Sequence, residues 1–378
     1  MIYLDNAATT MMSDAAIEAL LYASKKYYGN PSSSYAYGRQ SKNLLEEARQ
    51  IIANSIGALP EEIFFTSCGT ESDNWVISQS LSGNYDCVIT SQIEHHAILN
   101  PVELVKNRGI KTLSLPVDEG CVVKEKALVE SLAGKKNLVS IMLQNNETGV
   151  IQPIRKFASF VHTDNPNSIF HTDAVQAIGH IRIDVNELGV DMLSASAHKF
   201  NGPKGVGFLY IRKGIEMKPF IIGGGQEKSF RSGTENVPGI YSMAKALEDN
   251  IKHIDEQEQY IAALERRFFE RLNEKHIKYE VNGNRQIKAK GILNISINGI
   301  DGEGLLNVLD IHDVCISVGS ACKSKSKEPS HVLTAMGLAL ERVDSAVRVS
   351  IGKYNTDEDI DKLIQYVSDY YFVATQSK

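Results

Sequence analysis

Several features that would place this chain in a specialised class of protein are scarce or missing. Only five of its 378 residues are cysteine, and no two of them are spaced as Cys-x-x-Cys. An odd number of widely spaced cysteines favours neither a disulfide framework nor a structural zinc site. We therefore expect a reducing, cytoplasmic location and no bound metal, while a single functional thiol stays compatible with the pattern.

Excess positive charge and long apolar runs are absent too. Lys and Arg total 40 against 46 Asp and Glu, a net charge of −6, which argues against bulk binding to nucleic acid or anionic membranes. No apolar run reaches the ~18 residues that a membrane span requires. The opening residues, MIYLDNAATT, lack the basic-then-apolar pattern of a signal peptide. We expect no membrane and no direct nucleic-acid partner.

The phosphate-binding patterns Walker A and GxGxxG are also missing, so neither a P-loop ATPase nor a Rossmann dinucleotide site gains support. The composition itself is ordinary, with 43% hydrophobic and 23% charged residues, as in a globular protein. A chain of this length is expected to form about two or three domains.

Short β-rich apolar runs alternate with helical patterns between residues 60 and 215. Such alternation forms βαβ units, so we predict an α/β domain with a mostly parallel, seven-stranded sheet between helices. The predicted strands are 63–67, 86–91, 111–117, 138–144, 168–173, 190–196 and 206–211. The predicted helices are 13–27 with Ser13 as N-cap, 41–56, and four that begin near 70, 96, 124 and 154.

The pattern changes near residue 250, where one long amphipathic helix, 249–276, is predicted before shorter strands and helices. We interpret residues 14–250 as a large α/β domain. Residues 251–378, with residues 1–13 folded back onto them, would form a smaller α+β domain.

Lys199 lies just beyond a predicted strand, where parallel sheets bind their ligands. Partial desolvation there would favour its neutral amine, which makes it a candidate Schiff-base nucleophile. Taken alone, a surface lysine at a strand end is the simpler explanation.

Asp173 closes another predicted strand, and alone it is explained as a helix cap. Together with Lys199 it has a second interpretation. A Schiff-base lysine beside a buried carboxylate is what pyridoxal phosphate requires, because the carboxylate keeps the pyridine nitrogen protonated.

Such a cofactor also needs a phosphate site, and the segment 66–72 (TSCGTES) offers one. Gly69 permits close backbone approach, Thr70 offers a hydroxyl, and a helix begins there with free N–H groups. An ordinary helix N-cap explains the same residues.

His95 follows a strand and could stack on a ring or move protons. A metal site would need further ligands at turn or helical spacing, and none is found. Asn146 lies in an Asn- and Gly-containing turn, which local turn chemistry explains.

The stretch 317–327 (SVGSACKSKSK) is polar and predicts a loop. Cys322 lies beside three lysines, which favour its thiolate, although a unit charge at 4 Å in water contributes only ~1 kcal/mol. A solvated loop that contains a cysteine is the alternative. Arg348 lies in an apolar strand and needs an anion, either a local acid or a substrate carboxylate.

The chain as a whole resembles the cysteine desulfurases, pyridoxal-phosphate enzymes of aminotransferase class V with fold type I. The resemblance rests on nine segments in this order: YLDNAATT, TSCGTESDN, EHHA, NNETG, HTDAVQ, SASAHKFNGPKG, GGGQEKSFRSGTEN, GSACKSKSKEPSHVL and AVRVSIG. The length of the Ser-Ala-Cys loop is similar to that of the NifS/IscS-like branch.

The resemblance implies a role for each matching residue. Lys199 would hold the cofactor and remove the substrate's Cα proton, and Cys322 would receive the sulfur as a persulfide. Arg348 would bind the carboxylate of L-cysteine, and Thr234 would reach the phosphate of a neighbouring subunit in a homodimer. The remaining cofactor residues are Asp173 at the pyridine nitrogen, Gln176 and Asn146 near the phenolic oxygen, His95 on the ring, and Gly69, Thr70, Ser196 and His198 at the phosphate. Asn146 would also lie near the substrate carboxylate, and His95 could relay the proton of the substrate thiol.

The implied partner is a sulfur-acceptor protein, an iron–sulfur scaffold or a thiouridylase, which Lys323, Lys325 and Lys327 could help to dock. Iron–sulfur assembly and tRNA thiolation are both compatible with such transfer. Another class V enzyme, a selenocysteine lyase or an aminotransferase, is the alternative, and a non-catalytic relative is the alternative from another class. Cys68 and Ala197 stand where the family usually has glycine, and we expect cofactor binding to survive both changes. The longer C-terminal tail of some relatives is not found in the sequence, which puts an iron–sulfur scaffold in doubt.

Overall fold

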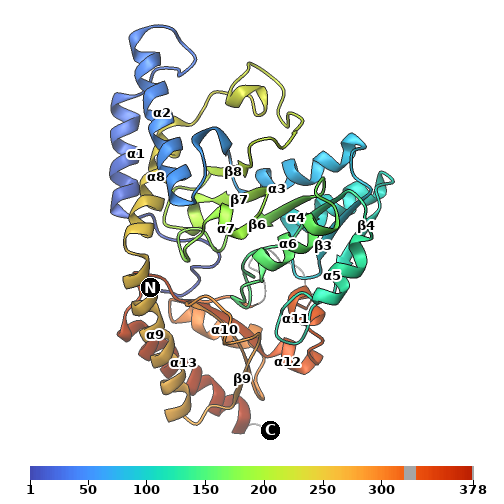
Figure 1. Cartoon of the computed structure of the whole chain (residues 1–378). Helices are drawn as coiled ribbons and strands as arrows, with labels where there is room; N and C mark the ends of the chain where they lie inside the picture. The colour runs from blue at the N-terminus through green and yellow to red at the C-terminus, as the bar shows by residue number, and fades with distance from the viewer. Residues whose placement is uncertain (319–328, 377–378) are drawn as a thin grey trace.

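The computed structural model describes residues 1–318 and 329–376, and a seven-stranded sheet lies at its centre (Figure 1). The strand order is β2-β8-β7-β6-β5-β3-β4. The strands are β2 (Ile63–Thr66), β3 (Cys87–Ser91), β4 (Thr112–Leu115), β5 (Asn137–Ser140), β6 (Ile169–Asp173), β7 (Met192–Ser196) and β8 (Gly207–Ile211). Only β8 runs antiparallel to its neighbours in this sheet. The mostly parallel sheet predicted from the sequence is confirmed, and each predicted run overlaps one strand.

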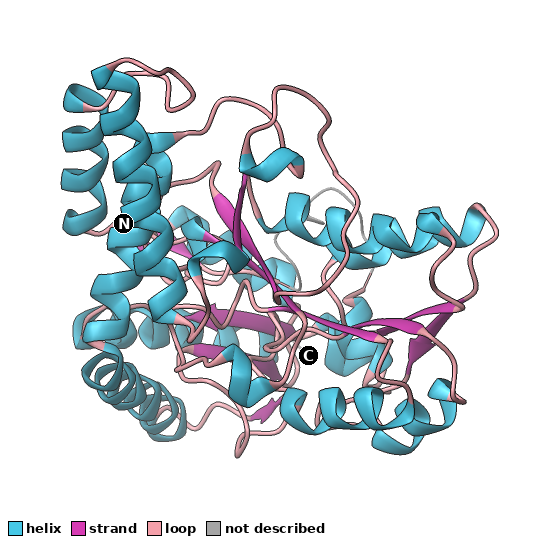
Figure 2. Cartoon of the chain, turned by 45° about the horizontal axis from the view of Figure 1, so that its top comes forward, coloured by secondary structure: helices cyan, strands magenta, loops and turns pink. Residues whose placement is uncertain are grey.

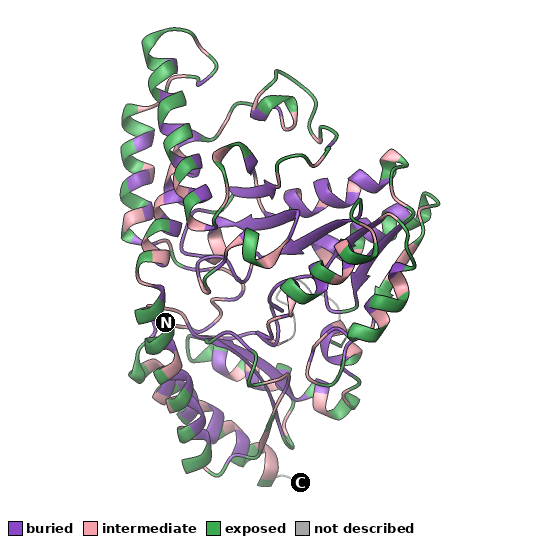
Figure 3. Cartoon of the chain, in the orientation of Figure 1, coloured by how far each residue is buried: buried purple, intermediate pink, exposed green. Residues whose placement is uncertain are grey.

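Helices cover both faces of this sheet, as Figure 2 shows. Successive strand residues point to opposite faces, so strands buried on both faces read as continuous apolar runs. In β2, Phe64 packs with Trp75 on one face and Phe65 joins the core on the other. Figure 3 shows the strands buried between helices whose outer faces are exposed. The helices of this part are α1 (Asp14–Lys26), α2 (Ala36–Ser55), α3 (Gly69–Ser78), α4 (His96–Asn107), α5 (Glu125–Leu132), α6 (Ile154–Asp164), α7 (Val185–Leu188) and α8 (Val237–Lys252).

The helix starts were predicted with mixed success. Ser13 caps α1 as predicted, with its hydroxyl accepting the Ala16 N–H at 3.2 Å. Helix α2 begins at Ala36, earlier than predicted. Its first turn contains Gly38, a weak helix former, and a Cβ there would lie 2.4 Å from the Ser33 carbonyl oxygen. Close packing therefore overrides local propensity at this end.

The long helix predicted over 249–276 is confirmed for most of its length, but its predicted start is wrong. Helix α8 ends at Lys252 and α9 (Ile254–Glu274) begins two residues later. His253 separates them with φ −110° and ψ 16°, and its Nδ1 lies 3.0 Å from the Asp249 carbonyl oxygen. A side chain that bonds a backbone carbonyl four residues back competes with the helical ladder.

A second core forms around a three-stranded antiparallel sheet of order β12-β10-β9. Leu4 belongs to this core, because β1 pairs with β11 in parallel. The elements here are β1 (Ile2–Tyr3), β9 (Tyr279–Val281), β10 (Ile292–Ile297), β11 (Val314–Cys315), β12 (Ala346–Ser350), α9, α10 (Gly302–Ile311), α11 (His331–Ala335), α12 (Leu340–Asp344) and α13 (Asp357–Gln376). The first residues thus lie on the second core, while the domain limits at 13 and 250 stay a prediction.

Short 3-10 helices complete the chain: η1 (Pro60–Glu62), η2 (Gln79–Ser82), η3 (Ala197–Lys199) and η4 (Glu227–Ser229). Across residues 1–318 and 329–376, no helix has both the length and the apolar character needed to cross a membrane.

Candidate active site

A cavity of about 250 Å³ opens beyond the carboxyl ends of β6 and β7. Ligands bind at this place in open α/β sheets. Most of the residues predicted for the site line it, from both ends of the chain. The lining residues are Ala7, Ala8, Cys68, Gly69, Thr70, Asp73, His95, Ala97, Met142, Asn146, Asp173, Val175, Gln176, Ser196, His198, Lys199 and Arg348.

Lys199 ends η3, the short turn that follows β7. Its Nζ donates to the carbonyl oxygens of Ala7 at 2.6 Å and Ala8 at 2.8 Å. The N-terminal segment therefore fixes the amine at the cavity. Sequence analysis missed this contact, because backbone carbonyls carry no residue-type signal.

Asp173 is the last residue of β6 and is 5% exposed. Burial raises the pKa of its carboxyl to about 6, opposed by the Val175 N–H, which it accepts at 2.9 Å, and by the charge of Lys199. Above pH 6 the carboxylate form predominates. A buried carboxylate in a cavity is suited to a protonated ring nitrogen.

Behind Asp173 lies a buried histidine on the same face of the sheet. His171 Nδ1 lies 2.9 Å from the Ser140 hydroxyl oxygen, and Nε2 lies 2.9 Å from that of Ser194. Burial lowers the pKa of His171 to about 3, so the ring is neutral. Two hydroxyl partners suit a neutral imidazole, which donates through one nitrogen and accepts through the other.

A second carboxyl, Asp73 of α3, lines the same cavity and was missed by the sequence analysis. It is 1% exposed, and its Oδ1 lies 3.8 Å from His171 Nε2 with no hydrogen-bond partner among the residues that the structure describes. Burial first, and the neighbouring Asp173 next, hold the pKa of Asp73 well above its usual range. One signal could have found it, since Asp73 lies one helical turn after Gly69 and shares its face.

His95 is the N-cap of α4, and its Nδ1 accepts the Ala97 N–H at 3.1 Å. That bond assigns the ring hydrogen to Nε2. Burial, followed by the charge of Lys199, lowers the pKa of His95 to about 4. A neutral ring with a donor at Nε2 can stack on an aromatic cofactor, but this tautomer has no free nitrogen to accept a thiol proton.

The residues predicted for a phosphate surround the start of α3. Gly69 is the first residue of that helix, and a Cβ there would lie 2.5 Å from Val175 Cγ2. Ser196 Oγ is buried and has no partner within the described part of the chain. His198 Nδ1 lies 3.2 Å from the Thr9 hydroxyl oxygen. A helix N-terminus beside an unsatisfied hydroxyl fits an anion, so the donor set matches the phosphate of pyridoxal phosphate.

The two departures from glycine fit their backbone. Cys68 has φ −175°, extended backbone that any residue adopts. Ala197 opens η3, is fully buried, and is not among the residues with positive φ. We still predict that cofactor binding survives both changes.

Arg348 brings β12 of the second sheet to the cavity and is 1% exposed. It donates to the Asn146 carbonyl oxygen at 2.9 Å and to Asp5 Oδ1 at 2.8 Å. Its Nε is buried without a partner among residues 1–318 and 329–376. The structure thus supplies the local acid, and the Nε–H is a donor that remains for a substrate carboxylate. Gln176 also lines the cavity and donates to the Ala7 carbonyl oxygen at 2.8 Å.

Two predicted residues are not brought together with the others. Thr234 is exposed and does not line the cavity. Cys322 lies outside the described residues, as do Lys323, Lys325 and Lys327.

Comparison with known proteins agrees with this geometry. The family model described as aminotransferase class V matches residues 2–363. The chain belongs to the aminotransferase class-V family. Its cofactor is pyridoxal phosphate, as the resemblance implied.

The relatives of this class-V protein are desulfurases by name. It is 43% identical over 372 residues to cysteine desulfurase IscS of Methanosarcina thermophila, covering 97% of this chain and 91% of the relative. It is 43% identical over 362 residues to cysteine desulfurase IscS of Dictyoglomus turgidum, covering 95% and 91%. A solved NifS-like protein superimposes with a TM-score of 0.92 at 36% identity, covering 98% and 99%. The predicted fold type I and the resemblance to the NifS/IscS-like branch are confirmed.

Proposed function

We propose that this class-V enzyme is a cysteine desulfurase. It converts L-cysteine to L-alanine and passes the sulfur, as a persulfide on Cys322, to an acceptor protein. The observation that carries the proposal is the meeting of Lys199, Asp173 and Arg348 at one cavity, in a chain similar to cysteine desulfurases over nearly its whole length.

Each of these cavity residues has a different role toward the cofactor. When bound, pyridoxal phosphate supplies an electron sink for the carbon that carries the substrate's amino group. Lys199 would hold the aldehyde group of the cofactor, and its Nζ is the base that would take the Cα proton of the substrate. Asp173 keeps a proton on the pyridine nitrogen, for which its ionised form above pH 6 is suited. His95, which lines the cavity, would hold the cofactor ring with its neutral imidazole.

Arg348 orients the substrate. Its guanidinium is held by Asn146 and Asp5, so it presents a fixed positive charge at the cavity. A carboxylate bound there fixes which atoms of cysteine face Lys199. The neutral Nε2–H of His95 can donate to the substrate but not accept from it, so another base must take the thiol proton.

Sulfur transfer is assigned to Cys322 by the family resemblance. Its thiolate forms an S–S bond with the substrate sulfur, and the substrate's C–S bond breaks with its electron pair left on carbon. That carbon gains a proton and leaves in L-alanine, while the sulfur stays on the enzyme as a persulfide. No external oxidant or reductant is consumed.

The substitution Cys322→Ala tests this function. A desulfurase should lose alanine release from L-cysteine at least ~100-fold and lose the added sulfur mass on the intact protein, while its visible cofactor absorption remains. Lys199→Ala is the control that should abolish both absorption and turnover. Alanine release at the wild-type rate from Cys322→Ala would instead support a lyase or aminotransferase that needs no cysteine.

The finer assignments rest on the resemblance. We infer a homodimer in which the exposed Thr234 completes the phosphate site of the neighbouring subunit. The acceptor would be an iron–sulfur scaffold or a thiouridylase, and the location would be cytoplasmic. Transfer of labelled sulfur from the persulfide to each purified candidate acceptor tests the choice between them.

A further inference from the structure

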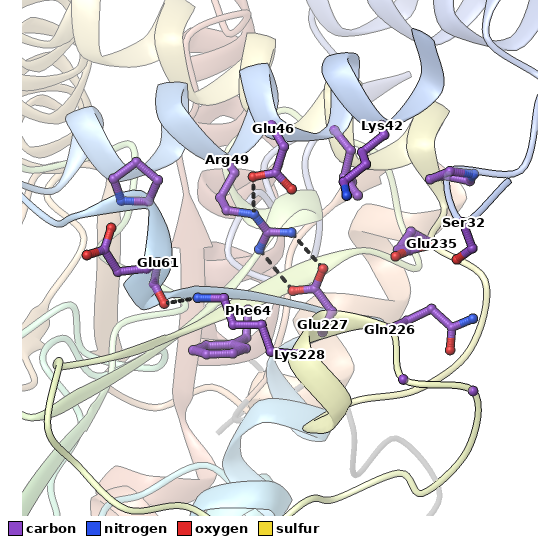
Figure 4. Close-up of a pocket in the computed structure, with 15 residues that line it drawn as sticks. Ser32, Lys42, Glu46, Arg49, Glu61, Phe64, Gln226, Glu227, Lys228 and Glu235 are labelled. Carbon is purple, nitrogen blue, oxygen red and sulfur yellow. Dashed lines mark hydrogen bonds and ion pairs between the residues drawn. The ribbon is translucent and has the colours of Figure 1, made fainter. Parts of the chain in front are cut away.

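The segment that carries Thr234, residues 223–235, is largely exposed, yet two of its residues, Glu227 and Ser232, are buried. Glu227 is 7% exposed and faces Arg49 of α2, also 7% exposed, beside a cavity of about 480 Å³ (Figure 4). The two form a bidentate pair, Nη2 to Oε1 at 2.7 Å and Nη1 to Oε2 at 2.9 Å. Two parallel bonds fix orientation as well as distance.

Both partners also bind the backbone of β2. Glu227 Oε2 accepts the Phe65 N–H at 2.9 Å, and Arg49 Nη1 donates to the Ile63 carbonyl oxygen at 2.6 Å. The guanidinium lies 4.5 Å from the centre of the Phe65 ring. The pair therefore joins the exposed segment to the backbone of the central sheet, in addition to the contacts of Phe230 and Lys228 with the Phe64 ring.

The backbone at this point is strained. Glu227, Lys228 and Ser229 have φ of 46°, 57° and 70°, a run of three left-handed residues with no glycine. L-residues rarely adopt this conformation, and it persists only where the surroundings over-determine it. On Glu227, the contact that holds this backbone conformation is the buried pair with Arg49.

A second contact ties the segment to the phosphate turn. Arg231 binds Glu71 through Nε at 2.8 Å and Nη2 at 3.1 Å, and Glu71 also accepts the Ser67 N–H at 2.8 Å. Glu71 follows Thr70 in the first turn of α3. Thr234 lies three residues beyond Arg231, so both anchors precede it closely.

We propose that Arg49 and Glu227 are positioning residues for Thr234. Their buried pair holds residues 227–229 in the left-handed conformation and thereby aims Thr234 at the cofactor phosphate of a second copy of this chain. This inference rests on the proposed homodimer.

The first test measures cofactor affinity. Glu227→Gln keeps the shape of the side chain but removes its charge, and should raise the dissociation constant for pyridoxal phosphate at least ~10-fold. Glu46→Gln is the matched control, because Glu46 also pairs with Arg49, at 3.2 Å, but its side chain is 52% exposed and binds neither β2 nor the segment. The control should stay within ~2-fold of wild type. Equal effects of the two variants would overturn the proposal.

A rescue separates positioning from general damage to the fold. Adding Ser229→Gly to Glu227→Gln should restore part of the affinity, because glycine adopts left-handed backbone without help. No recovery would contradict the role assigned to the strained turn. If Glu227→Gln does not fold, Glu227→Asp, which keeps the charge but shortens the reach, replaces it in every experiment.

Mixed dimers with two affinity tags decide which site is affected. One copy carries Lys199→Ala, so that only the other copy's site is measured. Affinity should fall when Glu227→Gln is on the Lys199→Ala copy, and should stay at the wild-type value when it is on the intact copy. The opposite pattern would show that the pair acts within its own subunit, and an equal loss in both would show that its effect is not specific to the neighbouring subunit's site; either result overturns the proposal. If the wild type sediments as a monomer, the proposed homodimer is refuted; this result is distinct from a failure of the positioning role of Arg49 and Glu227.

Discussion

At the scale of single residues, two acidic side chains, Asp73 and Asp173, line the cofactor cavity, and we expect them to differ in protonation state. Burial raises the pKa of both carboxyls, that of Asp173 to about 6 and that of Asp73 well above its usual range. Two neighbouring carboxylates resist joint ionisation, and only Asp173 has both a bond from the Val175 N–H and the nearby charge of Lys199, while Asp73 Oδ1 has no hydrogen-bond partner among the described residues. Asp73 therefore stays neutral and allows Asp173 to ionise.

This division predicts different results for the same amide substitution. Asp73→Asn resembles the protonated acid and should keep cofactor affinity within ~3-fold. Asp173→Asn cannot hold a proton on the pyridine nitrogen and should lower turnover at least ~100-fold. Steady-state alanine release and spectral titration of the cofactor measure both. A large shift in the spectral pH profile of Asp73→Asn would show that Asp73 is ionised.

Glu94 gives a prediction for stability against pH. It is fully buried, and burial raises the pKa of its carboxyl to about 8, opposed by bonds from Ser91 and the Met142 N–H. The folded state therefore keeps a proton that the unfolded chain releases above about pH 4.3. The unfolded state then binds fewer protons than the folded state, so this group lowers the free energy of unfolding as pH rises from about 4.3 to 8.

The measurement is urea unfolding of wild type and Glu94→Gln between pH 5 and 8. The wild type should lose stability relative to the variant as pH rises, at about 1.4 kcal/mol per pH unit at most. The new amide keeps an oxygen that can accept the Met142 N–H, so the variant should still fold. Parallel pH profiles would refute the assignment.

At the scale of elements, the strands were read from the sequence because strands buried on both faces are apolar throughout. The strand predictions also placed the ends of β6 and β7, and therefore Asp173 and Lys199, at one edge of the sheet, because the carboxyl ends of parallel strands lie on the same side. Asp73 escaped because it projects from a helix rather than from a strand end. The α8–α9 break was missed because it is confined to one residue, His253, and no glycine or proline marks it.

Helix caps were within reach of sequence reasoning, and Ser13 offers a test. Ser13→Ala removes the acceptor for the Ala16 N–H and should lower the free energy of unfolding by ~1 kcal/mol. Cofactor affinity should not change, because α1 does not line the cavity. Chemical unfolding and a cofactor titration measure the two quantities, and a fall in affinity would show that α1 supports the site.

At the scale of the whole molecule, the first ten residues connect the second core to the cavity. Leu4 is fully buried in the second core, Asp5 binds Arg348, and Ala7 and Ala8 bind Lys199. These links are between residues almost 200 positions apart or more, so composition and periodicity could not reveal them.

Leu4→Ala tests this connection. It should lower the free energy of unfolding by about 2–5 kcal/mol and also weaken cofactor binding, because the Ala7 and Ala8 carbonyls that hold Lys199 lie in the same short segment as Leu4. Leu305→Ala, equally buried in the same core but outside this segment, is the control and should lower stability alone. Equal affinity of the two variants for pyridoxal phosphate would contradict the connection.

The pairing of Arg49 with Glu227 has a consequence for solubility. Strand β2 is the outermost strand of its sheet, where unpaired backbone groups can recruit a strand from another molecule. The pair occupies the Phe65 N–H and the Ile63 carbonyl oxygen, two of the groups through which an incoming strand would attach. Without the pair, this four-residue edge strand, which contains Ile63, Phe64 and Phe65, would be open to intermolecular β-association and aggregation.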